Sequence, residues 1–104
     1  MSNITRHQSD SRLSRLVTHN GIAYLAGLTA DNRGATMKAQ TEEILKKIDG
    51  LLKLAGSDKS RLLSAMVYVT DMRLKPQMDE AWTAWVDPRH PPARACVETR
   101  LGTP

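Results

Sequence analysis

The sequence predicts an α+β domain in which two helices cover one face of a four-stranded sheet. Two observations indicate this class: segments of two-residue alternation are interleaved with two helical apolar stripes, and a tight-turn signal joins the first two strand-like segments. The predicted order is ββαβαβ. A chain of 104 residues forms one domain, residues 1–104, because a second core would need more chain.

The first part of the chain predicts a β-hairpin. Residues 1–11 are polar and unpatterned, which indicates a flexible start or a short edge extension. Residues 13–19 and 22–28 are strand-like. Asn20 and Gly21 between them both tolerate positive φ, which is typical of a two-residue hairpin turn.

Residues 36–55 predict a long amphipathic helix. Apolar side chains recur there at steps of three and four residues: Met37, Ile44, Leu45, Ile48, Leu51, Leu52 and Ala55. Gly56 follows at the position where a helix often ends on a glycine. The helix therefore has defined limits and one apolar face.

The second half predicts a strand, a shorter helix and a last strand. Residues 61–71 alternate as a strand does, and Pro76 opens an apolar helical stripe that ends before Pro88. The stripe consists of Met78, Ala81, Trp82 and Trp85. We interpret the two tryptophans as core packing. Residues 93–101 form the last strand, followed by a turn.

Two helices cover only one face of such a sheet, and the other face remains apolar. Met66 and Tyr68 lie on one strand, with apolar neighbours on the hairpin in either register. We therefore expect a homo-oligomer whose interface buries this face and creates clefts between subunits.

Composition excludes several classes of function. The net charge of +4 and pI of about 9.6 raise the possibility of nucleic-acid binding, but basic and acidic residues are interleaved and aromatics amount to 4%. We therefore expect no nucleic-acid partner. No apolar run is long enough to span a membrane and no leader is present, which predicts a cytoplasmic protein. Cys96 is the single cysteine, and the histidines lack metal-site spacing, so we expect neither a metal nor another cofactor.

Arg94 is the candidate functional residue of the last strand. Alternation puts Arg94, Cys96 and Glu98 on one face. A guanidinium in a partly dry cleft binds a carboxylate through two parallel hydrogen bonds. The pattern alone favours the simpler alternative, an edge arginine whose stem covers apolar surface while its head stays in water. Cys96 has a similar alternative as a small buried residue.

Four segments together resemble a known family. They are "GIAYLAG", "AQTEEILKKIDGLLKLAGSDKSRLLSAMVYVTDM", "MDEAWTAWV" and "HPPARACVE". In this order they resemble the RidA/YjgF family of small imine deaminases, formerly labelled L-PSP endoribonucleases. The resemblance runs from about residue 12 to the end of the chain, and "AWTAWV" is similar to a divergent branch.

The resemblance implies a chorismate-mutase-like homotrimer with a site in each cleft between subunits. There Arg94 matches the residue that holds the carboxylate of a 2-imino or enamine acid, which water hydrolyses to a 2-keto acid and ammonia. Cys96 and Ala95 match its neighbours on the last strand, and Ala26 and Gly27 match a segment lining the same cleft. The implied partner is a small carboxylate-bearing metabolite, without a cofactor.

Three departures from the family pattern bear on activity. Residues 12–14 lack the family's pocket tyrosine, and Asp79 stands where the family has a pocket asparagine, so that its charge would repel an anionic substrate. The family continues into a last strand carrying a water-orienting glutamate, and the sequence ends at Pro104. Glu98 lies about 13 Å along the strand from Arg94, which is too far for Glu98 to replace that glutamate.

Three functions therefore stand as hypotheses. The first is a deaminase of reactive imines or enamines. The second is a non-catalytic trimer that binds small carboxylates or regulates through them. The third, which the scattered charge disfavours, is an RNA-binding protein or ribonuclease.

Overall fold

The computed structural model describes residues 3–102 and confirms the α+β class. Its main elements follow the predicted order after one additional strand. They are β1 (Ile4–Ser9), β2 (Ser14–His19), β3 (Ile22–Leu25), α1 (Met37–Leu54), β4 (Ser64–Val69), α2 (Lys75–Trp85) and β5 (Ala93–Glu98). Two short 3-10 helices, η1 (Lys59–Arg61) and η2 (Met72–Leu74), precede β4 and α2.

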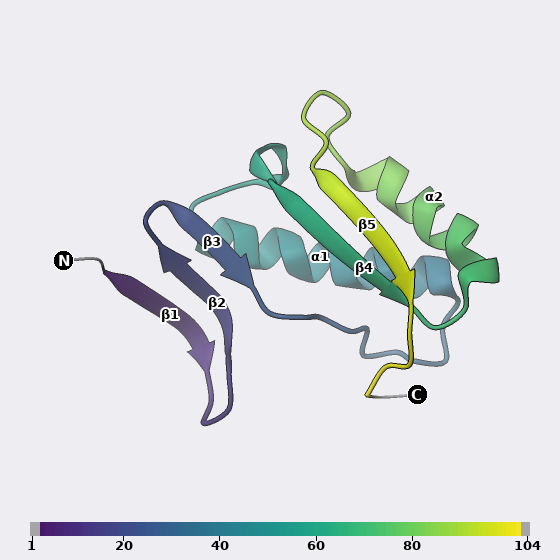
Figure 1. The fold of residues 1–104 in the computed structure, drawn as a ribbon, viewed down its shortest axis with the longest axis horizontal. Helices are drawn as coiled ribbons and strands as arrows, with labels where there is room; N and C mark the ends of the chain where they lie inside the picture. Colours follow the sequence, from purple (N-terminus) through teal and green to yellow (C-terminus); the bar gives the residue numbers. More distant parts are fainter. Residues whose placement is uncertain (1–2, 103–104) are drawn as a thin grey trace.

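The strands form two sheets. In the first, β1, β2 and β3 pair antiparallel in that order, and in the second β4 and β5 pair parallel (Figure 1). The predicted single sheet is wrong in this respect, because β3 and β4 are not paired within residues 3–102. Alternation along a strand specifies its two faces and leaves its pairing partner open. This is why the sequence predicts the strands and misses the division.

The edge strand β1 replaces part of the predicted flexible start. The expectation that residues 1–11 are flexible is wrong for Ile4–Ser9, which pair with β2 and so form the short edge extension given as the alternative. The hairpin of β2 and β3 is confirmed. Asn20 and Gly21 have φ of 51° and 77°, the left-handed pair that a type I′ turn needs.

Helix α1 has the limits that its terminal residues predict. The Thr36 hydroxyl accepts a hydrogen bond from the Ala39 N–H at 3.1 Å, and thereby caps the first turn. At the other end Gly56 adopts φ of 76°, and its N–H donates to the Lys53 carbonyl at 3.0 Å. The Ser57 N–H donates to the Leu52 carbonyl at 2.8 Å, which completes a glycine-terminated helix end.

Two glycines of this region offer a matched pair of substitutions with opposite expected effects. Gly56→Ala should lower the free energy of unfolding by about 1 kcal/mol, because a side chain disfavours the left-handed conformation. Gly50→Ala, inside α1 with open space around the added Cβ, should raise it by up to about 1 kcal/mol. Urea unfolding of both variants measures the two shifts, and equal signs would contradict this account of the helix end.

The core lies between the helices and the strands. Its buried apolar side chains come from both sheets and both helices, so the two sheets share one core; they include Leu16, Leu45, Leu51, Leu52, Val69, Met78 and Ala81. Helices α1 and α2 pack against each other on one side of the strands (Figure 1). No helix among residues 3–102 combines the length and apolar character needed to cross a membrane.

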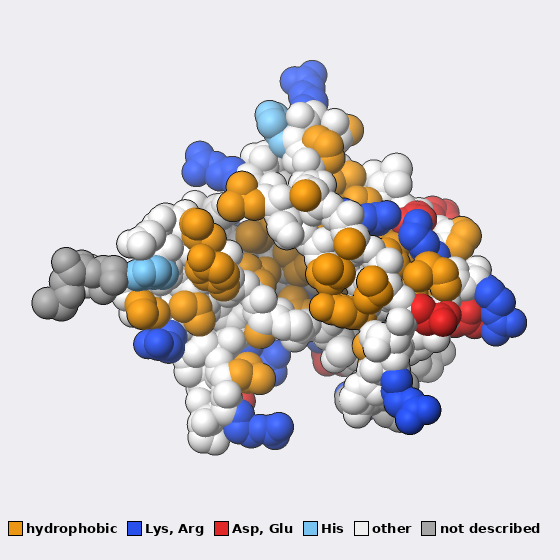
Figure 2. Space-filling model, in the orientation of Figure 1, with side chains coloured by type: hydrophobic (Ala, Val, Ile, Leu, Met, Phe, Trp, Pro, Cys, Tyr) orange, Lys and Arg blue, Asp and Glu red, His pale blue; other side chains and the backbone are white. Residues whose placement is uncertain are grey.

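The face of the strands opposite α1 is exposed and apolar. Tyr24 of β3 and Met66 and Tyr68 of β4 are 55%, 54% and 56% exposed, and Val97 of β5 is also exposed. Figure 2 shows hydrophobic side chains gathered on this face over β3 and over the β4–β5 sheet, with a hollow between the two groups. We call it the open face. Its apolar character agrees with the surface that the sequence predicts.

Candidate functional site

Strand β5 turns Arg94 toward the helices. In the parallel register Arg94 lies opposite Ala65 and Cys96 opposite Val67, on the face of β4 that also carries the buried Val69. Alternation therefore puts the guanidinium and the partly buried Cys96 thiol on the helix side of the sheet. Ala95 falls on the other face, with the exposed Tyr68, and so does not share a face with Arg94.

The head of Arg94 is held by three residues of α2. Its Nη2 donates to Asp79 Oδ1 at 3.0 Å, its Nη1 donates to Met78 Sδ at 3.6 Å, and its guanidinium carbon lies 5.3 Å from the centre of the Trp82 ring. The side chain is 23% exposed. The side chain of Arg94 is thus neither free in water nor fully buried, and its guanidinium contacts a carboxylate and an aromatic ring.

Asp79 links Arg94 to a second cation. Its Oδ2 accepts a hydrogen bond from Lys75 Nζ at 2.6 Å, one helical turn earlier. The hydrogen bond from Lys75 lowers the pKa of Asp79 most, the bond from Arg94 lowers it further, and partial burial acts in the opposite direction. The carboxylate is therefore ionised at neutral pH, and the two cations that pair with it reduce the repulsion expected from it.

The guanidinium keeps hydrogen-bonding capacity for a ligand. Of its five N–H groups, two donate to Met78 and Asp79, which leaves three without a protein acceptor among residues 3–102. Strand β5 is also an edge strand of its sheet, paired only with β4 in the described part of the chain. Three N–H groups of Arg94 are therefore available to a further acceptor while its bond to Asp79 is kept.

The other predicted site segment lies elsewhere in the chain. Ala26 and Gly27 follow β3, and the Ala26 N–H donates to the Arg15 carbonyl at 3.0 Å as the hairpin ends. In Figure 1 strand β4 lies between β3 and β5. Among residues 3–102 Arg94 and Asp79 are hydrogen-bonded to each other, and neither has a hydrogen bond or ion pair with Ala26 or Gly27.

Glu98 has a structural partner that its position in the sequence does not reveal. Its Oε1 accepts a hydrogen bond from the Met72 N–H at 2.7 Å, at the start of η2. This contact ties the end of β5 to the loop that leads into α2. The carboxylate is therefore engaged away from Arg94, as the strand spacing predicts.

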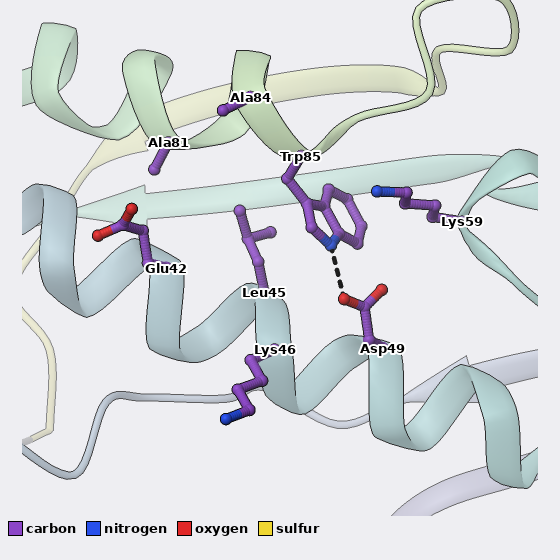
Figure 3. A pocket seen from close by; sticks show the side chains of 8 residues that line it. All are labelled: Glu42, Leu45, Lys46, Asp49, Lys59, Ala81, Ala84 and Trp85. Atoms are coloured by element: carbon purple, nitrogen blue, oxygen red, sulfur yellow. Dashed lines mark hydrogen bonds between the residues drawn. The ribbon is translucent and has the colours of Figure 1, made fainter.

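The two tryptophans of α2 serve two different surfaces. Their ring centres are 5.5 Å apart, and both side chains remain partly exposed, so the interpretation as core packing is incomplete. Trp82 contacts Arg94. Trp85 lines a groove of about 260 Å³ between α1 and α2, where its Nε1 donates to Asp49 at 3.0 Å and Lys59 lies over its ring (Figure 3).

This groove contains none of the predicted site residues. Its walls combine acidic, basic and apolar side chains of α1, η1 and α2 (Figure 3): Glu42, Leu45, Lys46, Asp49, Lys59, Ala81, Ala84 and Trp85. In the sequence, the feature that could have indicated this groove is the spacing of Trp82 and Trp85. The same spacing is equally typical of a helix face that is buried in the core. Among residues 3–102, no cluster of His, Cys, Asp or Glu side chains is arranged to hold a metal ion.

Comparison with known proteins identifies the family. Residues 4–102 match the family described as Endoribonuclease L-PSP. A RutC family protein of Haemophilus ducreyi is 40% identical over 101 residues, covering 97% of this chain and 86% of the relative. The RutC family protein YoaB of Escherichia coli is 36% identical over 101 residues, covering 97% and 88%.

A solved structure agrees with these sequence matches. The crystal structure of NMB1025, a YjgF-family protein from Neisseria meningitidis, superposes with a TM-score of 0.95 at 40% identity, over 98% of this chain and 85% of that one. The predicted fold class is thereby confirmed. The chain belongs to the RidA/YjgF family, whose matching description is Endoribonuclease L-PSP.

Proposed function

We propose that this protein hydrolyses reactive 2-imino or enamine acids to 2-keto acids and ammonia, in clefts between the subunits of a cytoplasmic homotrimer. The observation that carries the proposal is the state of Arg94. Its guanidinium is positioned by Asp79, Met78 and Trp82, its side chain is 23% exposed, and it retains three N–H groups for a carboxylate.

The arrangement of the chain supports a site shared between copies. Arg94 lies on β5, an edge strand in the described part of the chain, while Ala26 and Gly27 directly follow β3, the last strand of the other sheet. The open face supplies apolar surface that a neighbouring copy can bury. In such a trimer Ala26 and Gly27 of one subunit complete the cleft around Arg94 of the next.

The chemistry asked of the protein is positioning and charge stabilisation. Water adds to the imine carbon, the C–N bond breaks, and a protonated imine and water give a keto acid and an ammonium ion. Arg94 binds the acid group and thereby positions the imine carbon in the cleft. Trp82 and Met78 contact the guanidinium and restrict its movement. Every step proceeds without covalent attachment to the chain.

A coupled assay tests the proposal directly. A threonine dehydratase acting on threonine releases an enamine that becomes 2-ketobutyrate, whose appearance can be followed by absorbance. Added protein at micromolar concentration should accelerate keto-acid release without changing threonine consumption. Release that is unchanged across a hundredfold range of protein concentration would refute the deaminase function.

A non-catalytic carboxylate-binding trimer is the second candidate. The observation that favours it is the state of two carboxylates: Asp79 is paired with Lys75 and Arg94, and Glu98 accepts a hydrogen bond from the Met72 N–H. These bonds favour the ionised carboxylates and weaken both as acceptors of a proton from water. This candidate predicts that 2-ketobutyrate raises the melting temperature of the protein while the coupled assay shows no acceleration.

An RNA-directed function has less support. Several of the basic side chains are already paired with acids, namely Lys38 with Glu80, Lys47 with Asp31 and Glu43, Arg73 with Asp71, and Lys75 and Arg94 with Asp79. These pairs reduce the positive charge available to phosphates. Binding of single-stranded RNA that falls steeply with salt would revive this alternative.

A further inference from the structure

Arg94 and Asp79 form a pair of opposite charges with room for a ligand on each. Their hydrogen-bonded atoms are 3.0 Å apart, and the side chains are 23% and 35% exposed. Arg94 has three N–H groups without an acceptor among residues 3–102. Each oxygen of Asp79 accepts one hydrogen bond, whereas a carboxylate can accept about four in all. Both halves of the pair can therefore bind further groups.

The charges around this pair favour a particular kind of ligand. A ligand with only an acid group gains a contact with Arg94 but brings its negative charge next to Asp79, and the pairing of Asp79 with Lys75 and Arg94 reduces this repulsion without removing it. A ligand that carries a protonated nitrogen one carbon away from its acid group presents both signs at short separation. It can satisfy Arg94 with the acid group and Asp79 with the nitrogen at the same time.

We propose that Asp79 is a specificity-determining residue, which accepts a hydrogen bond from the cationic nitrogen of a ligand whose carboxylate is held by Arg94. The site then selects zwitterionic α-iminio or α-amino acids over simple keto acids. This inference rests on the proposed function, and it turns the substitution of Asp79 for the family's asparagine into a source of selectivity.

The same contact explains how product would leave. Hydrolysis transfers the nitrogen to an ammonium ion and leaves a keto acid without positive charge. The keto acid retains its contact with Arg94 and loses the one with Asp79, so it faces the repulsion that the substrate avoided. A site built this way discriminates between substrate and product by charge alone.

Two stable ligands of the same carbon skeleton test the inference. In isothermal titration, or in NMR titration where binding is weak, 2-aminobutyrate represents the zwitterion and 2-ketobutyrate the simple anion. The wild type should bind 2-aminobutyrate at least about tenfold more tightly, as expected for one charge-assisted hydrogen bond. Asp79→Asn should abolish this preference by weakening 2-aminobutyrate and strengthening 2-ketobutyrate.

Glu80→Gln is the matched control. It removes the same charge from the adjacent residue of α2, where the side chain is exposed and pairs with Lys38 away from Arg94. This variant should keep the wild-type ratio of affinities. A wild type without preference, a ratio that Asp79→Asn leaves unchanged, or a ratio that falls equally in both variants would overturn the inference.

The outcome is separable from that of the proposed function. Acceleration in the coupled assay together with an unchanged affinity ratio in Asp79→Asn would retain the deaminase and remove the role of Asp79. The predicted ratio without acceleration would retain the selectivity of the site and remove the catalysis.

Discussion

Replacing Arg94 by alanine is expected to reduce the acceleration of keto-acid release by about a hundredfold or more. The variant removes the only group that we assign to the substrate's carboxylate, and paired charge-assisted hydrogen bonds of this kind contribute several kcal/mol. It also leaves Asp79 paired with Lys75, so no uncompensated charge remains in the chain. The coupled assay, repeated at saturating dehydratase, measures the loss.

Two further variants give this prediction its specificity. Arg94→Lys keeps the charge and loses the planar fork, and we expect it to recover only a small part of the activity. Arg73→Ala serves as the control, because the Arg73 side chain is 89% exposed and its ion pair among residues 3–102 is with Asp71, two residues earlier. Full activity in Arg94→Ala, or an equal loss in Arg73→Ala, would show that the guanidinium on β5 is not the carboxylate site.

Replacing Tyr68 by glutamate is expected to dissociate the proposed trimer and to abolish the proposed activity together. Tyr68 is exposed on the open face, so a single chain tolerates the charge. In a trimer that buries this face, each subunit would place an unpaired carboxylate in the interface, at a cost of several kcal/mol. Sedimentation velocity should show particles of one third of the wild-type mass, and the coupled assay should show no acceleration.

The control for this variant lies on the helix layer. Leu54, at the end of α1, is also an exposed apolar residue, and it belongs to the layer on the other side of the strands. Leu54→Glu should leave both mass and activity unchanged. A wild type that sediments as a monomer would contradict the shared cleft, and so would a Tyr68→Glu variant that remains a trimer.

The local elements of the fold could be predicted well because their signals are local. The end residues of α1 depend on Thr36 and Gly56, whose hydrogen bonds span only a few positions. The hairpin turn depends on two residues that accept positive φ. The start of α2 is also a local signal. Proline fits the first turn of a helix, because the N–H that it lacks would have no acceptor within the helix there.

The candidate site could be predicted only in part. Alternation along β5 identifies Arg94, Cys96 and Glu98 as residues of one face, and it correctly separates Glu98 from Arg94 by distance. Alternation contains no information on what the guanidinium meets. The contacts with Met78, Asp79 and Trp82 arise because α2 packs over β5, which no periodicity in either segment specifies.

The sequence by itself determined the α+β class, the order of the main elements from β2 to β5 and the limits of α1, and it identified Arg94 as the candidate for binding an acid group. Each of these follows from interactions between residues a few positions apart. Only the tertiary structure decided that the strands divide into two sheets, that Ile4–Ser9 complete the first, and that Asp79 occupies one side of Arg94. These features depend on contacts between segments far apart in the chain. Such contacts form when the whole core packs, and the hydrophobic and van der Waals interactions that stabilise the core are individually weak and non-directional. No short stretch of sequence therefore specifies them.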